Sequence, residues 1–192
     1  TAAEIQAIFN AGSAGKSKTP FQALWVFSDE VTDPMKRQEL VQRSAASGVN
    51  ALYLSVYQSR FNSAGRLMYE DSDIAALITQ AHGEGIEVWA AYGAPDWPLL
   101  GCEPWAFPLL RMAEVIAYNA ANPSAKFDGV TLDVEPPEPQ TDSAFQNLLT
   151  LYECIRDTLA PEGLKFAVAI RFFWDTPVQF PSGTGTTKEV YK

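Results

Sequence analysis

Short apolar runs alternate with longer amphipathic stretches through most of the chain, and this alternation constrains the fold more than any other feature. The apolar runs have the length of strands and cover residues 23–28, 51–57, 87–92, 127–134 and 165–171. The stretches between them place apolar residues three and four positions apart, as helices do, near residues 34–48, 72–84, 105–121 and from 142 onward. Strands that alternate with helices in this order form βα units around a parallel sheet. A further short helix is expected at residues 2–10.

Five βα units in series are typical of either a doubly wound sheet or a (β/α)8 barrel, the TIM barrel. After the first apolar run the chain reads Phe27-Ser28-Asp29-Glu30, which is acidic where a dinucleotide site needs a glycine-rich turn. This difference favours the barrel, which needs at least about 200 residues. We therefore expect an α/β fold in which residues 1–192 form one catalytic-type domain covering about the first five units of a TIM barrel. The domain is expected to be truncated on its C-terminal side and completed by a second chain or a missing segment.

Composition narrows the classes of function. With 47% hydrophobic residues the chain can form a globular core, and it has no apolar run of about 18 residues, so no membrane span is expected. Fourteen Lys and Arg against 23 Asp and Glu disfavour nucleic acid as a partner. His82 is the single histidine of the sequence and falls at the end of a predicted helix, and Cys102 and Cys154 have no metal-ligand spacing, so a His/Cys metal site has too few ligands. Asp29 and Glu30, together with Asp133, are too loosely spaced to predict a cation site, and no cofactor is expected.

The two cysteines are expected to be free thiols. Cys102 falls in a loop at the carboxyl ends of the predicted strands, whereas Cys154 falls about twelve residues along a later helix. Twelve helical residues correspond to roughly 18 Å toward the opposite end of the fold. A disulfide tolerates a Cα separation of only about 7 Å.

Two carboxylates stand at the end of the fourth predicted strand, where β/α barrels place their active sites. Strand periodicity puts Thr131, Asp133 and Glu135 on one face, with neighbouring side chains roughly 6–7 Å apart. Repulsion between two carboxylates at this separation favours keeping one of them protonated, as a general acid requires. The alternative is a solvated acidic strand end before the turn at Pro136-Pro137.

The segment 127–135, FDGVTLDVE, resembles the family 18 glycoside hydrolase signature D-G-x-D-x-D-x-E of chitinase-like enzymes, which lies on the fourth barrel strand. The resemblance implies that Glu135 is the general acid/base and that Asp133 orients the acetamido group of the substrate. It also matches Asp128 to the first acid of the motif. Thr131 departs from the family, which usually has a second inward aspartate there. A threonine hydroxyl can hydrogen-bond Asp133 but cannot share its charge.

A second family resemblance also assigns the role of catalytic acid to Glu135. Glu135-Pro136 is similar to the end of the Asn-Glu-Pro motif of clan A glycosidases, which also lies on strand four. Val134 stands where that clan has asparagine. In this retaining alternative the nucleophile would lie on a seventh strand, outside this chain.

Further substrate-binding residues are expected among polar and aromatic side chains at the barrel mouth, because sugar rings stack on flat apolar faces. Trp25 and Trp89 are instead assigned to the barrel core, which aromatic residues on strands usually fill. The candidates, beside Asp128 and Thr131, are Asp29, Tyr57, Tyr92, Trp97, Arg171 and Trp174.

These residues predict a glycoside hydrolase that cleaves a polysaccharide or oligosaccharide by acid/base catalysis from Glu135. The alternative from another class is a non-catalytic carbohydrate-binding or scaffold barrel. A polysaccharide substrate would favour a secreted or cell-surface location. A barrel lyase or aldolase would commonly need an interior lysine, and Lys165 opens the fifth strand at the wrong end.

Overall fold

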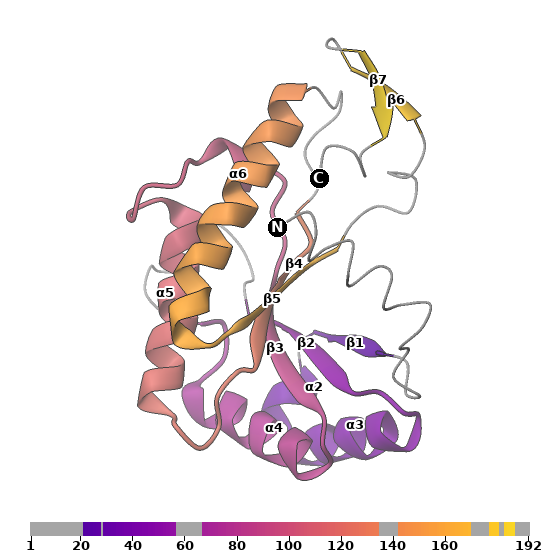
Figure 1. Ribbon diagram of the computed structural model, residues 1–192. Coiled ribbons are helices and arrows are strands. Elements are labelled where there is room, and N and C mark those ends of the chain that lie inside the picture. The colour runs from indigo at the N-terminus through magenta and orange to yellow at the C-terminus, as the bar shows by residue number, and fades with distance from the viewer. Residues whose placement is uncertain are drawn as a thin grey trace.

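The centre of the fold is a parallel sheet of five strands that lie side by side in sequence order (Figure 1). The computed structural model describes residues 21–27, 29–56, 67–134, 142–169, 177–180 and 183–186. The strands are β1 (Ala23–Val26), β2 (Ala51–Ser55), β3 (Glu87–Tyr92), β4 (Gly129–Leu132) and β5 (Lys165–Val168). This sheet confirms the expected α/β fold with five units of a partial TIM barrel.

Helices follow the strands and lie along the outer side of the sheet (Figure 1). They are α2 (Asp29–Thr32), α3 (Pro34–Ala46), α4 (Asp71–Gly83), α5 (Phe107–Ala121) and α6 (Asp142–Leu159), with 3-10 turns η1 (Trp97–Leu99) and η2 (Ala160–Glu162). Asp33 caps α3, because its Oδ1 accepts hydrogen bonds from the amides of Met35 and Lys36 at 2.9 and 3.3 Å. None of the described helices is both long and apolar enough to cross a bilayer.

The two faces of the sheet carry different residues. On the helix side, strand residues such as Leu54, Ala90 and Leu132 are fully buried in the core with Ile78 of α4 and Ile155 of α6. On the other face the ladder register sets up two rows across the strands. The lower row is Trp25, Tyr53, Trp89, Gly129 and Lys165. The upper row, nearer the carboxyl ends of the strands, is Ser55, Ala91, Thr131 and Ala167, whose small side chains leave space above the aromatic row.

The C-terminal part contains an element that the sequence did not predict. β6 (Pro177–Phe180) and β7 (Gly183–Thr186) form an antiparallel hairpin, beyond the last of the five predicted strands. The short four-residue helix α2 was also missed. The expected leading helix at 2–10 lies outside the described residues.

A disulfide joins Cys102 to Cys154, with their Cα atoms 6.0 Å apart, so the prediction of free thiols is wrong. That prediction assumed that the long loop after β3 stays at the carboxyl edge of the sheet. Instead the loop turns through η1, which packs against α6. Sγ of Cys102 consequently lies 3.5 Å from the carbonyl oxygen of Thr150, about one helical turn before Cys154.

Candidate functional site

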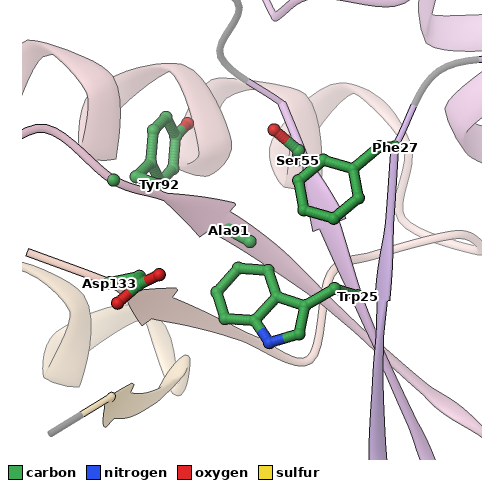
Figure 2. Close-up of a pocket in the computed structure, with 7 residues that line it drawn as sticks. Trp25, Phe27, Ser55, Ala91, Tyr92 and Asp133 are labelled. Atoms are coloured by element: carbon green, nitrogen blue, oxygen red, sulfur yellow. The ribbon is translucent and has the colours of Figure 1, made fainter. Parts of the chain in front are cut away.

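A pocket of about 400 Å³ lies at the carboxyl ends of β1 to β4. This is the end of the strands at which β/α barrels place their active sites, and the volume is in the range of sites for small ligands. Figure 2 shows the residues around it. The lining consists of Trp25, Phe27, Ser55, Ala91, Tyr92, Gly93 and Asp133.

The β1 side of the pocket is a wall of two aromatic rings. Trp25 and Phe27 stand two residues apart on one strand face, and their rings are nearly parallel, at 11°, with centroids 6.2 Å apart. Tyr53 of β2 supports Trp25 edge-on at 5.4 Å. Assigning Trp25 wholly to the core was therefore wrong, because its half-buried ring lines the pocket. Phe27 was not among the predicted binding residues, although strand alternation places it on the same face of β1 as Trp25.

The floor of the pocket is made of small residues. Ser55 and Ala91 are paired across β2 and β3, and Gly93 follows β3. A Cβ added to Gly93 would lie 2.9 Å from the carbonyl oxygen of Asp133, so glycine lets the chain after β3 approach the chain after β4. The space above this floor is bounded by Trp25 on one side and Asp133 on the other (Figure 2).

Asp133 directly follows β4 and is exposed at the pocket. Its amide donates a 2.8 Å hydrogen bond to the carbonyl oxygen of Tyr92, which continues the β3–β4 pairing beyond the strand. Thr131 lies two residues earlier and is buried. Glu135, the expected acid/base, lies two residues beyond Asp133 and outside the described residues.

Tyr92 and Trp97 occupy the helix side of the sheet, which corrects the expectation that their rings bind sugar. The Tyr92 ring points toward the helices (Figure 2), is 2% exposed and donates a hydrogen bond to the carbonyl oxygen of Arg111 at 3.3 Å. Its burial raises the pKa of the phenol far above the usual value. Trp97 is 1% exposed and packs against Tyr92 and Phe107. Tyr92 therefore borders the pocket without exposing its ring to it, and the Trp97 ring is enclosed.

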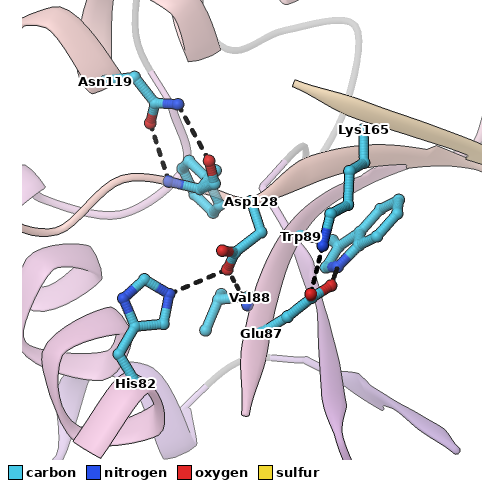
Figure 3. Close-up of polar contacts among 8 residues, drawn as sticks. His82, Glu87, Val88, Trp89, Asn119, Asp128 and Lys165 are labelled. Atoms are coloured by element: carbon cyan, nitrogen blue, oxygen red, sulfur yellow. Dashed lines mark hydrogen bonds and ion pairs between the residues drawn. The ribbon is translucent and has the colours of Figure 1, made fainter. Parts of the chain in front are cut away.

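Asp128 lies at the opposite end of β4 from the pocket, where its carboxylate ties three elements together (Figure 3). Oδ2 of Asp128 is 2.9 Å from Nε2 of His82 at the end of α4, and it accepts the Val88 amide of β3 at 2.8 Å. His82 is therefore at a helix end away from the pocket, as predicted. These contacts give Asp128 a structural part in joining α4, β3 and β4.

A second polar cluster lies at the same end of the sheet. Glu87 pairs with Lys165 and accepts a 2.9 Å hydrogen bond from the Trp89 indole. Burial alone would raise the pKa of Glu87, but the hydrogen bonds from Lys165 and Trp89 outweigh burial and hold the pKa below its usual value. Lys165 thus opens β5 far from the pocket, as predicted.

The remaining candidates are not placed. Tyr57, Arg171 and Trp174 lie outside the described residues, and so does the side chain of Asp29, whose backbone begins α2. Within the described part of the chain, no three His, Cys, Asp or Glu side chains gather in a way that could hold a metal ion.

Comparison with known proteins identifies the fold. No protein-family model matches the chain, and no curated protein sequence does. Among solved structures, the chain is similar to the C-terminal domain of a chitinase-like protein from Desulfitobacterium hafniense DCB-2, with 17% identity and a TM-score of 0.58 over 80% of this chain and 46% of that chain. A β-N-acetylhexosaminidase matches with 15% identity and a TM-score of 0.51 over 80% and 47%.

A sugar phosphate isomerase/epimerase from Parabacteroides distasonis matches with 9% identity and a TM-score of 0.53, over 92% of this chain and 62% of that chain. The chain thus spans less than two thirds of the length of each of these structures. Its structural neighbours are TIM-barrel proteins that include glycoside hydrolases, and the likeness to them is a likeness of fold.

Proposed function

We propose that the chain contributes to a glycoside hydrolase site in which Glu135 is the general acid/base and Asp133 is the neighbouring carboxylate that orients the substrate. The observation that supports this proposal most is the position of Asp133, exposed at a pocket at the carboxyl ends of the strands and opposite the aromatic pair Trp25 and Phe27. Glycosidases act with carboxyl groups that flank the scissile bond, and Glu135 follows Asp133 by one strand repeat.

The proposed chemistry uses Glu135 twice. It first protonates the glycosidic oxygen and then, as a carboxylate, activates the water that completes hydrolysis. With a 2-acetamido sugar, the acetamido oxygen of the substrate is the nucleophile and Asp133 positions that group, as the family 18 resemblance implies. With a sugar that lacks this group, a second carboxylate must act as nucleophile or base, either Asp29 or a residue outside this chain.

The disulfide between Cys102 and Cys154 supports a secreted or cell-surface location for the proposed enzyme. Disulfides persist in oxidising compartments and are rare in the reducing cytosol. Polymeric carbohydrates are commonly encountered outside the cell, so the location and the proposed substrate agree.

The test is Glu135→Gln, assayed on fluorogenic glycosides with and without a 2-acetamido group. We expect turnover to fall by about 10²–10⁴-fold, the usual contribution of a general acid/base, while oligosaccharide binding and thermal stability stay at wild-type values. Glu153→Gln is the matched control, since Glu153 is exposed on α6. Activity restricted to 2-acetamido glycosides would favour the substrate-assisted reaction. Wild-type turnover by the Glu135 variant would refute the proposal.

A second candidate function is carbohydrate binding without catalysis. The aromatic wall of the pocket favours it, because Trp25 and Phe27 can hold a sugar without any acid. Oligosaccharide binding by a wild-type protein that turns over no glycoside would select this function over the hydrolase.

A further inference from the structure

The aromatic pair on β1 is more exposed than the aromatic residues of β3. Trp89 and Tyr92 of β3 are buried, whereas Phe27 is 59% exposed and Trp25 is half-buried. Large exposed rings beside a hollow are a common mark of a binding surface. Because both rings also line the pocket, their exposed faces are directed at the space that a ligand would fill.

The Trp25 ring is held in place from the side, by residues of the same row of the sheet. Tyr53 contacts it edge-on at 5.4 Å and 78°, and Trp89 in turn supports Tyr53 at 5.9 Å. These contacts come from the neighbouring strands of the ladder, so they fix the orientation of the indole before any ligand arrives. A preorganised ring loses little rotational freedom on binding, which favours affinity.

Two polar side chains border the pocket, Ser55 next to Phe27 and Asp133 opposite the rings (Figure 2). The Asp133 carboxylate faces the space from the β4 side, and the Ser55 hydroxyl borders it from β2 (Figure 2). A ligand that fits this arrangement has one flat apolar face and a polar rim. A pyranose ring has this form, with C–H groups on its face and hydroxyl groups around its edge.

We infer that Trp25 and Phe27 form a stacking subsite for an uncharged sugar ring, whose hydroxyl or acetamido edge is bound by Ser55 and Asp133. This inference rests on the proposed function and names its substrate class. Charge excludes the anionic alternatives. The Asp133 carboxylate borders the pocket and the whole chain has a net charge of −9, so a sugar phosphate or a uronate would be repelled.

The experiment measures binding by calorimetry to N-acetylchitotetraose and cellotetraose as uncharged probes, and to tetragalacturonate as an anionic probe. For Trp25→Ala and Phe27→Ala we expect the Kd for an uncharged probe to rise about 10- to 100-fold, the equivalent of losing the burial of one aromatic side chain. Trp25→Phe should retain most of the affinity, because it keeps a ring. Phe27→Ala keeps the test valid if Trp25→Ala fails to fold, since Phe27 is mostly exposed.

Trp105→Ala is the matched control, because Trp105 is 74% exposed and lies outside the pocket lining. Its Kd should equal that of the wild type. The inference is overturned if both alanine variants bind the uncharged probes as the wild type does. It is also overturned if the wild type binds tetragalacturonate more tightly than it binds the uncharged probes, or if the alanine substitutions change only the oligomeric state.

Failure of the subsite and failure of the hydrolase are separable. Weakened binding by the ring variants, together with a wild type that turns over no glycoside, supports the subsite and overturns the catalytic proposal. Unchanged binding by the ring variants, together with activity that Glu135→Gln abolishes, supports the hydrolase and overturns the subsite. A wild type that binds neither uncharged probe overturns both.

Discussion

Gly129 shows how one residue determines the packing of the sheet at the level beneath the pocket. It stands in the ladder between Trp89 of β3 and Lys165 of β5. A Cβ at this position would lie 2.7 Å from Cε3 of the Trp89 ring and 2.7 Å from the Lys165 carbonyl oxygen. Glycine therefore leaves the volume that the Trp89 indole occupies, and Trp89 supports the aromatic row that ends at Trp25.

We predict that Gly129→Ala lowers the free energy of unfolding by about 1–3 kcal/mol, the usual cost of overpacking a core position. The backbone oxygen of Lys165 cannot yield without disturbing β5, so only the Trp89 ring can move. Urea denaturation followed by tryptophan fluorescence would measure the loss. Gly83→Ala is the control, since nothing lies within 4 Å of its added Cβ at the end of α4. Equal stability of the two variants would contradict the argument.

Individual side chains show which parts of the candidate site could be predicted from the sequence and which could not. Strand alternation correctly placed Thr131 and Asp133 on the face opposite the helices. It could not separate Trp25 from Trp97, because ring exposure depends on residues distant in the sequence. Trp97 is covered by Tyr92 and Phe107, whereas Trp25, which contacts Tyr53 and Phe27, stays half-buried. The motif likewise could not show that Asp128 would be held by His82.

At the scale of elements, the sequence predicted the strands and longer helices well, because the central strands are buried on both faces and read as apolar runs, whereas each longer helix buries one apolar face. β3 matched at both ends, at Glu87 and Tyr92, and the β4 ladder was shorter than predicted. The hairpin of β6 and β7 contains Pro177, Gly183 and Gly185, residue types that are depleted in strands, so its strand signal was weak. Loop paths were the weakest predictions, as the course of the chain after β3 demonstrates.

The Cys102–Cys154 disulfide fastens that loop to α6 and closes a segment of 52 residues. We predict that its reduction lowers the free energy of unfolding by about 2–4 kcal/mol, chiefly because the unfolded chain gains freedom. Chemical denaturation with and without a phosphine reductant would measure the difference. The Cys102→Ser/Cys154→Ser double variant should have the lower stability and should not respond to the reductant. Two titratable thiols in the untreated, denatured protein would contradict the bond itself.

At the scale of the whole molecule, the described sheet ends at β1 on one side and β5 on the other. A closed barrel has no edge strands, whereas an open edge offers unpaired backbone groups to another chain. Beside the β1 edge, Phe21, Leu24 and Phe27 are exposed. The solved structures of similar fold extend well beyond the part that this chain matches. These observations support the proposal that further barrel units, from another chain or segment, complete the fold.

We therefore predict that this 192-residue chain, in isolation, sediments at a mass above its 21.1 kDa, because an open edge strand offers its backbone N–H and C=O groups for pairing with a second chain. Leu24→Lys should shift the sedimentation profile toward the monomer, since a charge on an edge strand opposes pairing. Leu99→Lys, at an exposed position of η1 away from the sheet edge, should leave the profile unchanged. A monomer of 21.1 kDa across the micromolar range would instead indicate that these strands need no partner, and would favour the scaffold or binding function over the hydrolase.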